Sequence, residues 1–421
     1  MMAVLLGTFT LRFSTGLTGG LLVFYLRDLR VDAFALAVFT ATFFAAELVL
    51  SAPFGLLSDR LGHHRIMQVG PVFGAIAVVM TWATTDLVII GGTRWLEGAS
   101  TAASVPSILG FIAMVTAGNE LMRGRASARF EGATLAGIGV GITAAGLLYD
   151  GIPGIAAGLG RNAFLLNAVI YGVSFLIYRF GVEAPAGEAR TLDAPHYGWR
   201  RYGQLLTASS VWLLAPTWIA INAALGLWTS QAVFQLIRAP DPRFADQLLM
   251  GGFVGAQIAL GLGVGLVVFF AGLAYWGERF KSLRRTTIIF YGIVGGAVSV
   301  AAAIAINHSA GLPDVVRLAA ALGTAAGVFV LAGATPAALG LLADISEAYP
   351  ADRGAIMGLY SVFLAVGQIM GAFVGAESAN RAGIDGILVS TILLLAIALV
   401  PLARLRRFEH AVGVAPEPGT T

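Results

Sequence analysis

The sequence contains no cysteine and little charge. Without cysteine there is no disulfide, no thiolate nucleophile and no cysteine-based metal site. Charged residues make up 12% of the 421 residues, whereas soluble domains carry about 25%. This shortage excludes an ordinary water-soluble globule. The net charge of +3 is small, and it gives no reason to expect nucleic acid as a partner.

Catalytic motifs are also missing. The five histidines all fall in predicted connecting segments, at positions 63, 64, 196, 308 and 410. No HExxH, GxSxG or Walker-type run occurs, so the patterns that mark common hydrolases and nucleotide-binding enzymes are absent from the sequence. We therefore expect neither enzymatic activity nor a cofactor or bound metal.

Apolar residues dominate what remains. Hydrophobic residues reach 57% and the mean hydropathy is +0.83, in long runs along nearly the whole chain. A helix needs roughly 20 apolar residues to cross a bilayer, and its backbone must satisfy its own hydrogen bonds there. The runs are continuous rather than alternating, which is not the pattern of a membrane β-barrel. The predicted fold class is an all-α membrane protein.

Cutting the sequence at charged and turn-rich clusters gives twelve predicted spans. They are 4–26, 34–57, 66–84, 87–116, 130–150, 161–181, 209–236, 248–274, 286–306, 313–343, 354–376 and 385–403. The longest polar interval separates six spans from six. We expect six-helix bundles at 1–181 and 209–407, a cytoplasmic linker at 182–208 and a disordered tail at 408–421, an organisation typical of transporters with two halves.

Basic residues are distributed unevenly between the two sides. If the N-terminus lies inside, the cytoplasmic segments hold 17 of the 26 Lys and Arg, the opposite side holds 7, and Arg12 and Arg94 lie within spans. The positive-inside rule therefore predicts that both termini are cytoplasmic. We expect a multi-pass protein of the cytoplasmic (inner) membrane.

The most specific motif is GLLSDRLGHHR at residues 55–65. It resembles the signature loop of the major facilitator superfamily, G-x-L-(A/S)-D-R-x-G-(R/K)-(R/K), with His63 and His64 in place of two basic residues. The resemblance implies a gate in which the loop latches the cytoplasmic side against span eleven. The expected gating residues are Gly55, Asp59, Arg60, Gly62, Arg65 and Gly354. The alternative is a charged turn that only sets topology.

Two further runs are similar to patterns of the same family. RWLEGASTA at residues 94–102 resembles R-x-x-(Q/E)-G-x-(G/S)-x-A, whose arginine is linked with proton coupling in many members. Gly137, Gly141 and Gly146 resemble an antiporter pattern, although Ile142 replaces its proline and Ala145 a glycine. The alternative for these glycines is close helix packing.

Five ionisable residues lie inside predicted spans, where a charge costs at least about 2.5–3.5 kcal/mol on insertion scales. These candidates for proton coupling are Arg12, Glu47, Arg94, Glu97 and Glu131. A rise of about 1.5 Å per residue puts Glu97 nearest the midplane, one helix turn from Arg94, and puts Arg12 level with Glu47. We expect Glu97 to be the proton carrier, with Glu47 next. The alternatives are structural ion pairs, and for Glu131 an interfacial position.

The second half has no deep acid but several polar and aromatic positions. Such faces suit a neutral or weakly polar organic solute. The candidate substrate-binding residues are Trp218, Asn222, Trp228, Gln231, Gln235, Gln257, Tyr360 and Gln368. The alternative is that the amides form interhelical hydrogen bonds while the tryptophans anchor in lipid.

These features together predict a monomeric, proton-coupled secondary transporter of small molecules that works by alternating access. Export of amphipathic compounds is the first hypothesis. Uptake of a sugar-like solute is the second, because Ile142 departs from the antiporter pattern. A non-transporting sensor is the third, although the longest loop, about 26 residues, is too short for a soluble output domain.

Overall fold

The computed structural model describes residues 1–116, 120–184, 209–279, 282–338, 341 and 353–411. Its residues form two compact units, which we describe separately. The first comprises Met1–His196 and Phe253–Gly263, and the second comprises Tyr197–Gly252 and Val264–Thr421. The predicted linker falls largely, and the tail partly, outside the described residues.

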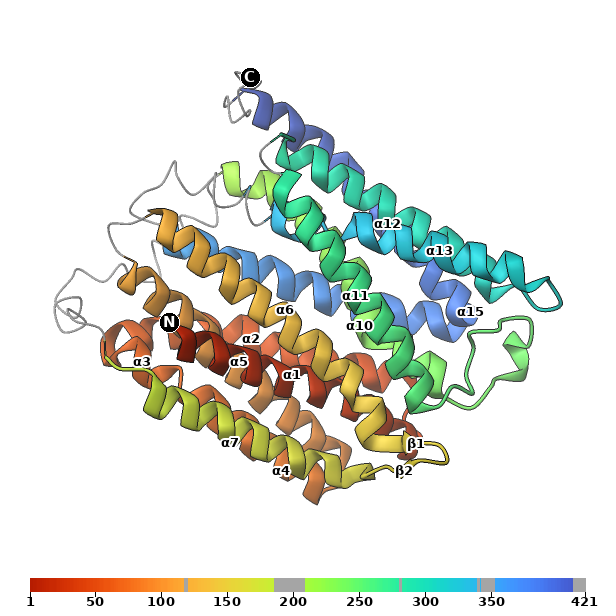
Figure 1. The fold of residues 1–421 in the computed structure, drawn as a ribbon, viewed down its shortest axis with the longest axis horizontal. Helices are drawn as coiled ribbons and strands as arrows, with labels where there is room; N and C mark the ends of the chain where they lie inside the picture. The colour runs from red at the N-terminus through yellow and green to blue at the C-terminus, as the bar shows by residue number, and fades with distance from the viewer. Residues whose placement is uncertain (117–119, 185–208, 280–281, 339–340, 342–352, 412–421) are drawn as a thin grey trace. The chain divides into compact units, whose positions relative to one another are not determined.

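The first unit is built from helices joined by short turns (Figure 1). Its elements are α1 (Met2–Asp28), α2 (Ala33–Leu61), α3 (His63–Ile66), α4 (Val69–Ala83), α5 (Leu87–Val115), α6 (Glu120–Asp150), the strands β1 (Gly151–Ile152) and β2 (Ala156–Ala157), η1 (Gly160–Asn162) and α7 (Ala163–Gly181). Helix α1 packs against α6 and α7, α2 against α5, and α4 against α5 and α7.

The second unit contains α10 (Ser209–Ile237), η2 (Pro242–Phe244), most of α11 (Gly255–Arg279), α12 (Arg285–Asn307), α13 (Asp314–Leu331) and α15 (Arg353–Ala411). Helix α10 packs along α15, and α12 packs against both α13 and α15. A core at the α10 and α15 contact includes Trp218, which is 1% exposed, together with Phe363 and Leu402.

The fold class is that predicted, and the described part of the chain has a helix for each of the twelve spans. Nine helical segments among the described residues are long and apolar enough to cross a membrane, and one of them, Ser361–Arg407, contains two predicted spans. The remaining predicted spans correspond to α5 and α10. Helix α15 is broken at Ala382 and Gly383, where Gly383 has a φ of +61° that favours glycine.

Some predicted boundaries differ from the ends of the helices. The predicted span 130–150 agrees with the apolar segment Ala128–Asp150, although helix α6 itself begins earlier, at Glu120. Helix α11 begins at Gly255 rather than 248, because Gly251 and Gly252 adopt positive φ angles that end any helix there. Helix α13 ends at Leu331, a turn at 332–333 follows, and helix resumes at 334–338, while the predicted end of the span at 343 lies outside the described residues. A long apolar run in the sequence does not reveal where the helix within it begins or is interrupted.

Side-chain caps set two helix starts. Asp32 accepts the backbone N–H of Ala35 at 2.7 Å, and Asp86 accepts that of Val88 at 2.7 Å. Each cap satisfies a backbone donor that the helix start leaves without an intrahelical partner. These two aspartates therefore fix where the helices begin, in addition to making the turns hydrophilic.

Candidate functional site

The candidate site is a group of buried charges inside the first unit, which we call the charged cluster. Its members are Arg12 of α1, Glu47 of α2, Arg94 and Glu97 of α5, and Glu131 of α6. Glu97 is 2% exposed, and Arg12, Glu47 and Arg94 are 8% exposed. Glu131 is half-buried. Four helices thus each contribute at least one charged side chain to the interior of the first unit.

Arg94 and Glu97 form an ion pair between successive turns of α5. The Arg94 guanidinium also lies over the Phe43 ring of α2, with its carbon 4.7 Å from the ring centroid. Nε of Arg94 and Oε1 of Glu97 are buried without a hydrogen-bond partner among the described residues. The pair is therefore neutralised in charge but incompletely satisfied in hydrogen bonding.

Arg12 is shared rather than paired. Its Nη1 donates to Oγ1 of Thr101 at 3.4 Å, and its charge interacts electrostatically with both Glu47 and Glu131. No carboxylate oxygen lies within 4.0 Å of its guanidinium among the residues that the structure describes. Arg12 therefore attracts Glu47 over a longer distance than a direct ion pair, and it attracts Glu131 in the same way.

Sequence reasoning missed two tyrosines of α7 beside the cluster. Tyr171 and Tyr178 are fully buried, and both interact electrostatically with Arg12. Tyr171 also interacts with Arg94. A Cβ at Gly74 would overlap the Tyr171 ring, and one at Gly7 would overlap the Tyr178 ring. In the sequence, the glycines that face these rings were the feature that could have indicated that the two tyrosines are buried.

Further polar contacts hold α7 against α1. Asn167 donates from Nδ2 to the Ser14 carbonyl at 3.0 Å and to Oγ1 of Thr18 at 2.8 Å. Oγ of Ser174 donates to Oγ1 of Thr10 at 2.7 Å. Buried amide and hydroxyl bonds of this kind fix the helix that carries both tyrosines.

The signature loop has a defined backbone. Gly62 ends α2 with a φ of +97° and donates its N–H to the Ser58 carbonyl, so the turn that follows α2 requires this glycine. A Cβ at Gly55 would make only ordinary contact with Pro106, 3.8 Å away, so close helix approach does not require glycine there.

The remaining loop residues are partly described. Arg60 and Arg65 are exposed. Nδ1 of His63 lies 3.0 Å from Oγ of Ser58, and its ring occupies the space that a side chain at Gly110 of α5 would need. The side chain of Asp59 and the surroundings of Gly354 lie outside what the structure describes, and the predicted latch stays a prediction.

In the second unit the predicted substrate face is buried against α15. Gln231 and Gln235 are 0% exposed, and Asn222 is 2% exposed. Nε1 of Trp228 donates to Oγ1 of Thr391 at 2.9 Å. Nε2 of Gln235 lies 3.4 Å from Oε1 of Gln231. The Trp228 bond joins α10 to α15, whereas Gln231 and Gln235 contact each other within α10.

Three other candidates differ in position. Gln368 is 7% exposed and accepts a hydrogen bond from Thr229 at 3.0 Å. Gln257, expected at depth, lies exposed in the first turn of α11, where its Oε1 accepts the Val254 N–H at 3.1 Å. The expectation of depth was wrong because α11 begins later than predicted. The side chain of Tyr360 lies outside the described residues.

A second network joins the ends of α1 and α6 on the predicted outer side. Arg27 donates two hydrogen bonds to Asp150, at 2.9 and 3.0 Å, and Tyr149 donates to Asp28 at 2.8 Å. Asp150 also accepts the Gly255 N–H at 3.1 Å, within the first unit. Gly146 of the antiporter-like pattern packs backbone to backbone with Gly255. The network was not predicted.

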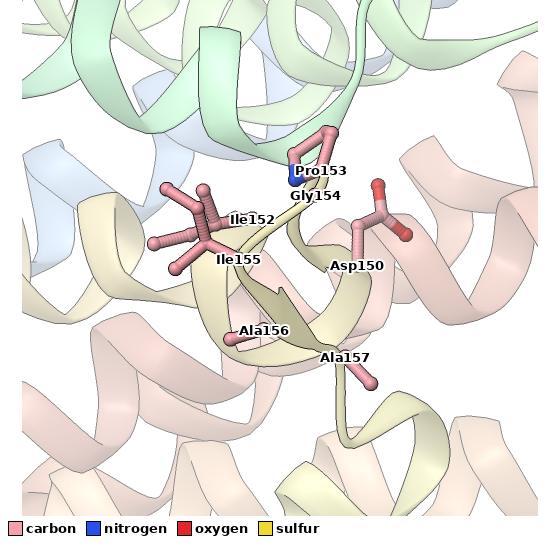
Figure 2. Close-up of a pocket in the computed structure, with 7 residues that line it drawn as sticks. All are labelled: Asp150, Ile152, Pro153, Gly154, Ile155, Ala156 and Ala157. Atoms are coloured by element: carbon pink, nitrogen blue, oxygen red, sulfur yellow. The ribbon is translucent and has the colours of Figure 1, made fainter.

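A hollow of about 400 Å³ lies beside this network, at the turn between β1 and β2 (Figure 2). Asp150 and the hairpin residues 152–157 line it. Figure 2 shows the side chains of Ile152 and Ile155 on one side of the hairpin and that of Asp150 on the other. The hollow is remote in sequence from the charged cluster, and we assign it no role.

Outside the spans, one acid has a clearly altered pKa. Hydrogen bonds from the Arg243 side chain and backbone lower the pKa of Asp241 to about 2. The ionised cap that Asp241 provides to η2 therefore persists at neutral pH, and it is lost only as the pH falls through about 2.

Comparison with known proteins identifies relatives in one family. A family model described as Major Facilitator Superfamily matches residues 4–312. The quinolone resistance protein NorA of Staphylococcus aureus (strain MRSA252) is 25% identical over 164 residues, which are 38% of this chain and 42% of that protein. The lysophospholipid transporter LplT of Cronobacter sakazakii is 29% identical over 147 residues, 34% of each chain. The alignments span less than half the length of these curated relatives.

A solved structure has the same fold. The crystal structure of the nucleoside transporter NupG matches with a TM-score of 0.70, covering 96% of this chain and 98% of that chain. The two sequences are 12% identical. At this identity the likeness concerns the arrangement of helices alone.

Proposed function

Because the chain belongs to the Major Facilitator Superfamily, we propose that it is a proton-coupled secondary transporter that exports amphipathic small organic molecules by alternating access. The observation that carries the coupling is the composition of the charged cluster. It holds three carboxylates, of Glu47, Glu97 and Glu131, but two guanidiniums, of Arg12 and Arg94. A buried cluster that takes up one proton becomes neutral, which its apolar surroundings favour.

The contacts support a choice among the three acids. Glu97 is held by the adjacent Arg94, so its carboxylate is stabilised in the ionised form. Glu47 and Glu131 compete for one cation, Arg12. We therefore assign the exchangeable proton to Glu47 and Glu131, in preference to Glu97, which on sequence alone is the acid nearest the midplane.

The substrate class rests on the relatives. The name of NorA refers to quinolone resistance, and that of LplT refers to lysophospholipid transport. Lysophospholipids are amphipathic, with one polar and one apolar end. Uptake of a sugar-like solute is the second candidate, because Ile142 replaces the proline of the antiporter pattern and adjoins the packed Gly141.

The test is transport into proteoliposomes that contain the full chain. With an imposed pH gradient we expect accumulation of a fluorescent quinolone, and a protonophore should abolish it. Glu47→Gln and Glu131→Gln should each remove at least nine-tenths of the gradient-driven rate. Glu377→Gln, at an exposed acid of α15, is the matched control and should leave the rate unchanged.

Each outcome bears on a separate part of the proposal. Wild-type rates in both glutamine variants would contradict the assignment of the proton. Accumulation of a sugar but not of a quinolone would favour the second candidate. If neither solute moves under a gradient while the protein binds one of them, the non-transporting sensor is the better hypothesis.

A further inference from the structure

Three side chains capable of binding metal meet on the surface of the second unit. Asp246 follows η2, His308 follows α12, and Asp385 follows the break in α15. Nε2 of His308 lies 2.8 Å from Oδ2 of Asp385, and Nδ1 of His308 lies 3.7 Å from Oδ2 of Asp246. One ligand atom from each residue lies within 4.8 Å of the others. Among the described residues no other group of three satisfies this geometry.

A buried amide, Asn307, connects two of these segments. Asn307 is 0% exposed. Its backbone carbonyl accepts the Leu248 N–H at 2.8 Å, and its side-chain Oδ1 accepts the Leu249 N–H at 2.9 Å. Its Nδ2 donates to Oδ1 of Asp385 at 2.8 Å. The amide therefore fixes one oxygen of Asp385 and leaves Oδ2 facing His308.

Gln247 also joins the segment of Asp246 to the segment of Asp385. Its Oε1 accepts the Ile384 N–H at 2.8 Å, and its Nε2 donates to the Ala382 carbonyl at 3.0 Å. The residue beside Asp246 is thus bonded to the backbone beside Asp385. Hydrogen bonds that orient ligating side chains are typical of metal sites, where they hold the donors in place before the ion binds.

The donor set indicates the kind of ion. Zn²⁺ binds both imidazole nitrogen and carboxylate oxygen, and catalytic zinc sites have three protein ligands with water in the fourth position. Mg²⁺ and Ca²⁺ prefer sites with oxygen donors only and higher coordination numbers. Zinc bonds of about 2.0–2.2 Å at tetrahedral angles separate ligand atoms by roughly 3.3 Å. In the structure Asp385 faces Nε2 of His308 and Asp246 faces Nδ1, so Asp246, whose side chain is 68% exposed, moves to the Nε2 side when the ion binds.

We propose that Asp246, His308 and Asp385 form a Zn²⁺ site on the predicted outer surface of the second unit. The ion replaces the hydrogen bond between His308 and Asp385, and its charge neutralises the two carboxylates. The ion links the segment before α11 to the end of α12 and to the residues that follow the break in α15. This site belongs to the second unit, whereas the charged cluster belongs to the first, and it does not depend on the proposed transport activity. Neither the sparse histidines nor the absence of cysteine had indicated a metal.

The test uses the full chain in detergent, with the affinity tag removed and metals stripped by a chelator. Zinc chloride is titrated, and bound zinc is measured after gel filtration together with the unfolding temperature. We expect one zinc per chain and a saturable rise in the unfolding temperature. His308→Ala and Asp385→Asn should each weaken zinc binding at least 100-fold, while Mg²⁺ at the same concentration should change nothing.

The matched control is Asp314→Asn, which removes an acid with a 97% exposed side chain on the same predicted side. This variant should bind zinc as the wild type does. Equal zinc content in the wild type and in His308→Ala would overturn the proposal, and so would equal loss in Asp314→Asn. All three side chains are partly or largely exposed, so the variants should elute as the wild type does. A variant that aggregates is replaced by His308→Gln.

Discussion

At the scale of single residues, the ion pair of Arg94 and Glu97 is the costliest arrangement in the charged cluster. Both side chains are at least nine-tenths buried, so each charge depends on the other for compensation. We expect Arg94→Gln or Glu97→Gln alone to destabilise the protein by about 3–5 kcal/mol, because each leaves a buried charge unpaired. The double variant should recover part of this loss. Thermal unfolding in detergent measures all three.

The chain offers a control with the same chemistry at the surface. Arg381 and Glu377 form an i,i+4 pair whose side chains are 78% and 56% exposed. Solvent screens such a pair, so its glutamine variants should change stability by less than about 1 kcal/mol. If the double variant at Arg94 and Glu97 is no more stable than the worse single variant, the two charges do not compensate each other.

Sequence found the charged residues but not their surroundings. An arginine or glutamate inside an apolar run is conspicuous because membrane insertion makes it costly, and Arg12, Glu47 and Arg94 were found in this way. Tyr171 and Tyr178 were missed because tyrosine is common at membrane interfaces, and one sequence does not reveal which ring faces inward. His308 and Asp385 are 77 residues apart, and only the tertiary fold brings them together.

At the scale of helices, close packing of α1 on α6 depends on particular glycines. A Cβ at Gly16 would overlap the backbone of Ile138, which cannot move aside as a flexible side chain can. A Cβ at Gly19 on the same helix would meet nothing within 4 Å. The two positions differ in packing alone, and the contrast provides a matched pair of variants.

We expect Gly16→Ala to lower the unfolding temperature and the folded yield, because α1 and α6 must separate to admit the methyl group. Gly19→Ala should be neutral or slightly stabilising, since alanine favours helix over glycine by up to about 1 kcal/mol. Fluorescence-detected gel filtration after a heat step compares the two. Equal behaviour of the variants would show that Gly16 does not limit the approach of the helices.

Helix existence could be predicted better than helix ends. A run of apolar residues predicts each span because the bilayer imposes its length. The ends depend on single torsions and caps. Gly62, Gly251 and Gly383 adopt positive φ angles, but a sequence with 54 glycines does not show which of them do so. The late start of α11 moved Gln257 from the predicted interior to the surface.

At the scale of the whole molecule, the two compact units are not continuous in sequence. Residues Phe253–Gly263 belong to the first unit by their contacts, although they follow the start of the second in sequence. The Asp150 hydrogen bond to Gly255 and the packing of Gly146 on Gly255 account for this assignment. A long interval of polar residues indicates where a chain divides, but it carries no information about a helix whose first turns pack elsewhere.

The orientation of the whole chain is the remaining prediction, and the lack of cysteine makes it directly testable. The excess of arginine on one side predicts cytoplasmic termini. Single cysteines at Thr85 and Asp314 should then react with a membrane-impermeant maleimide in intact cells. Cysteines at Leu61 and Arg279 should react only after permeabilisation. All four positions are exposed in the structure, so burial does not limit the reaction. Labelling of Leu61→Cys and Arg279→Cys in intact cells, with protection of the other two, would reverse the orientation and place the proposed zinc site on the cytoplasmic face.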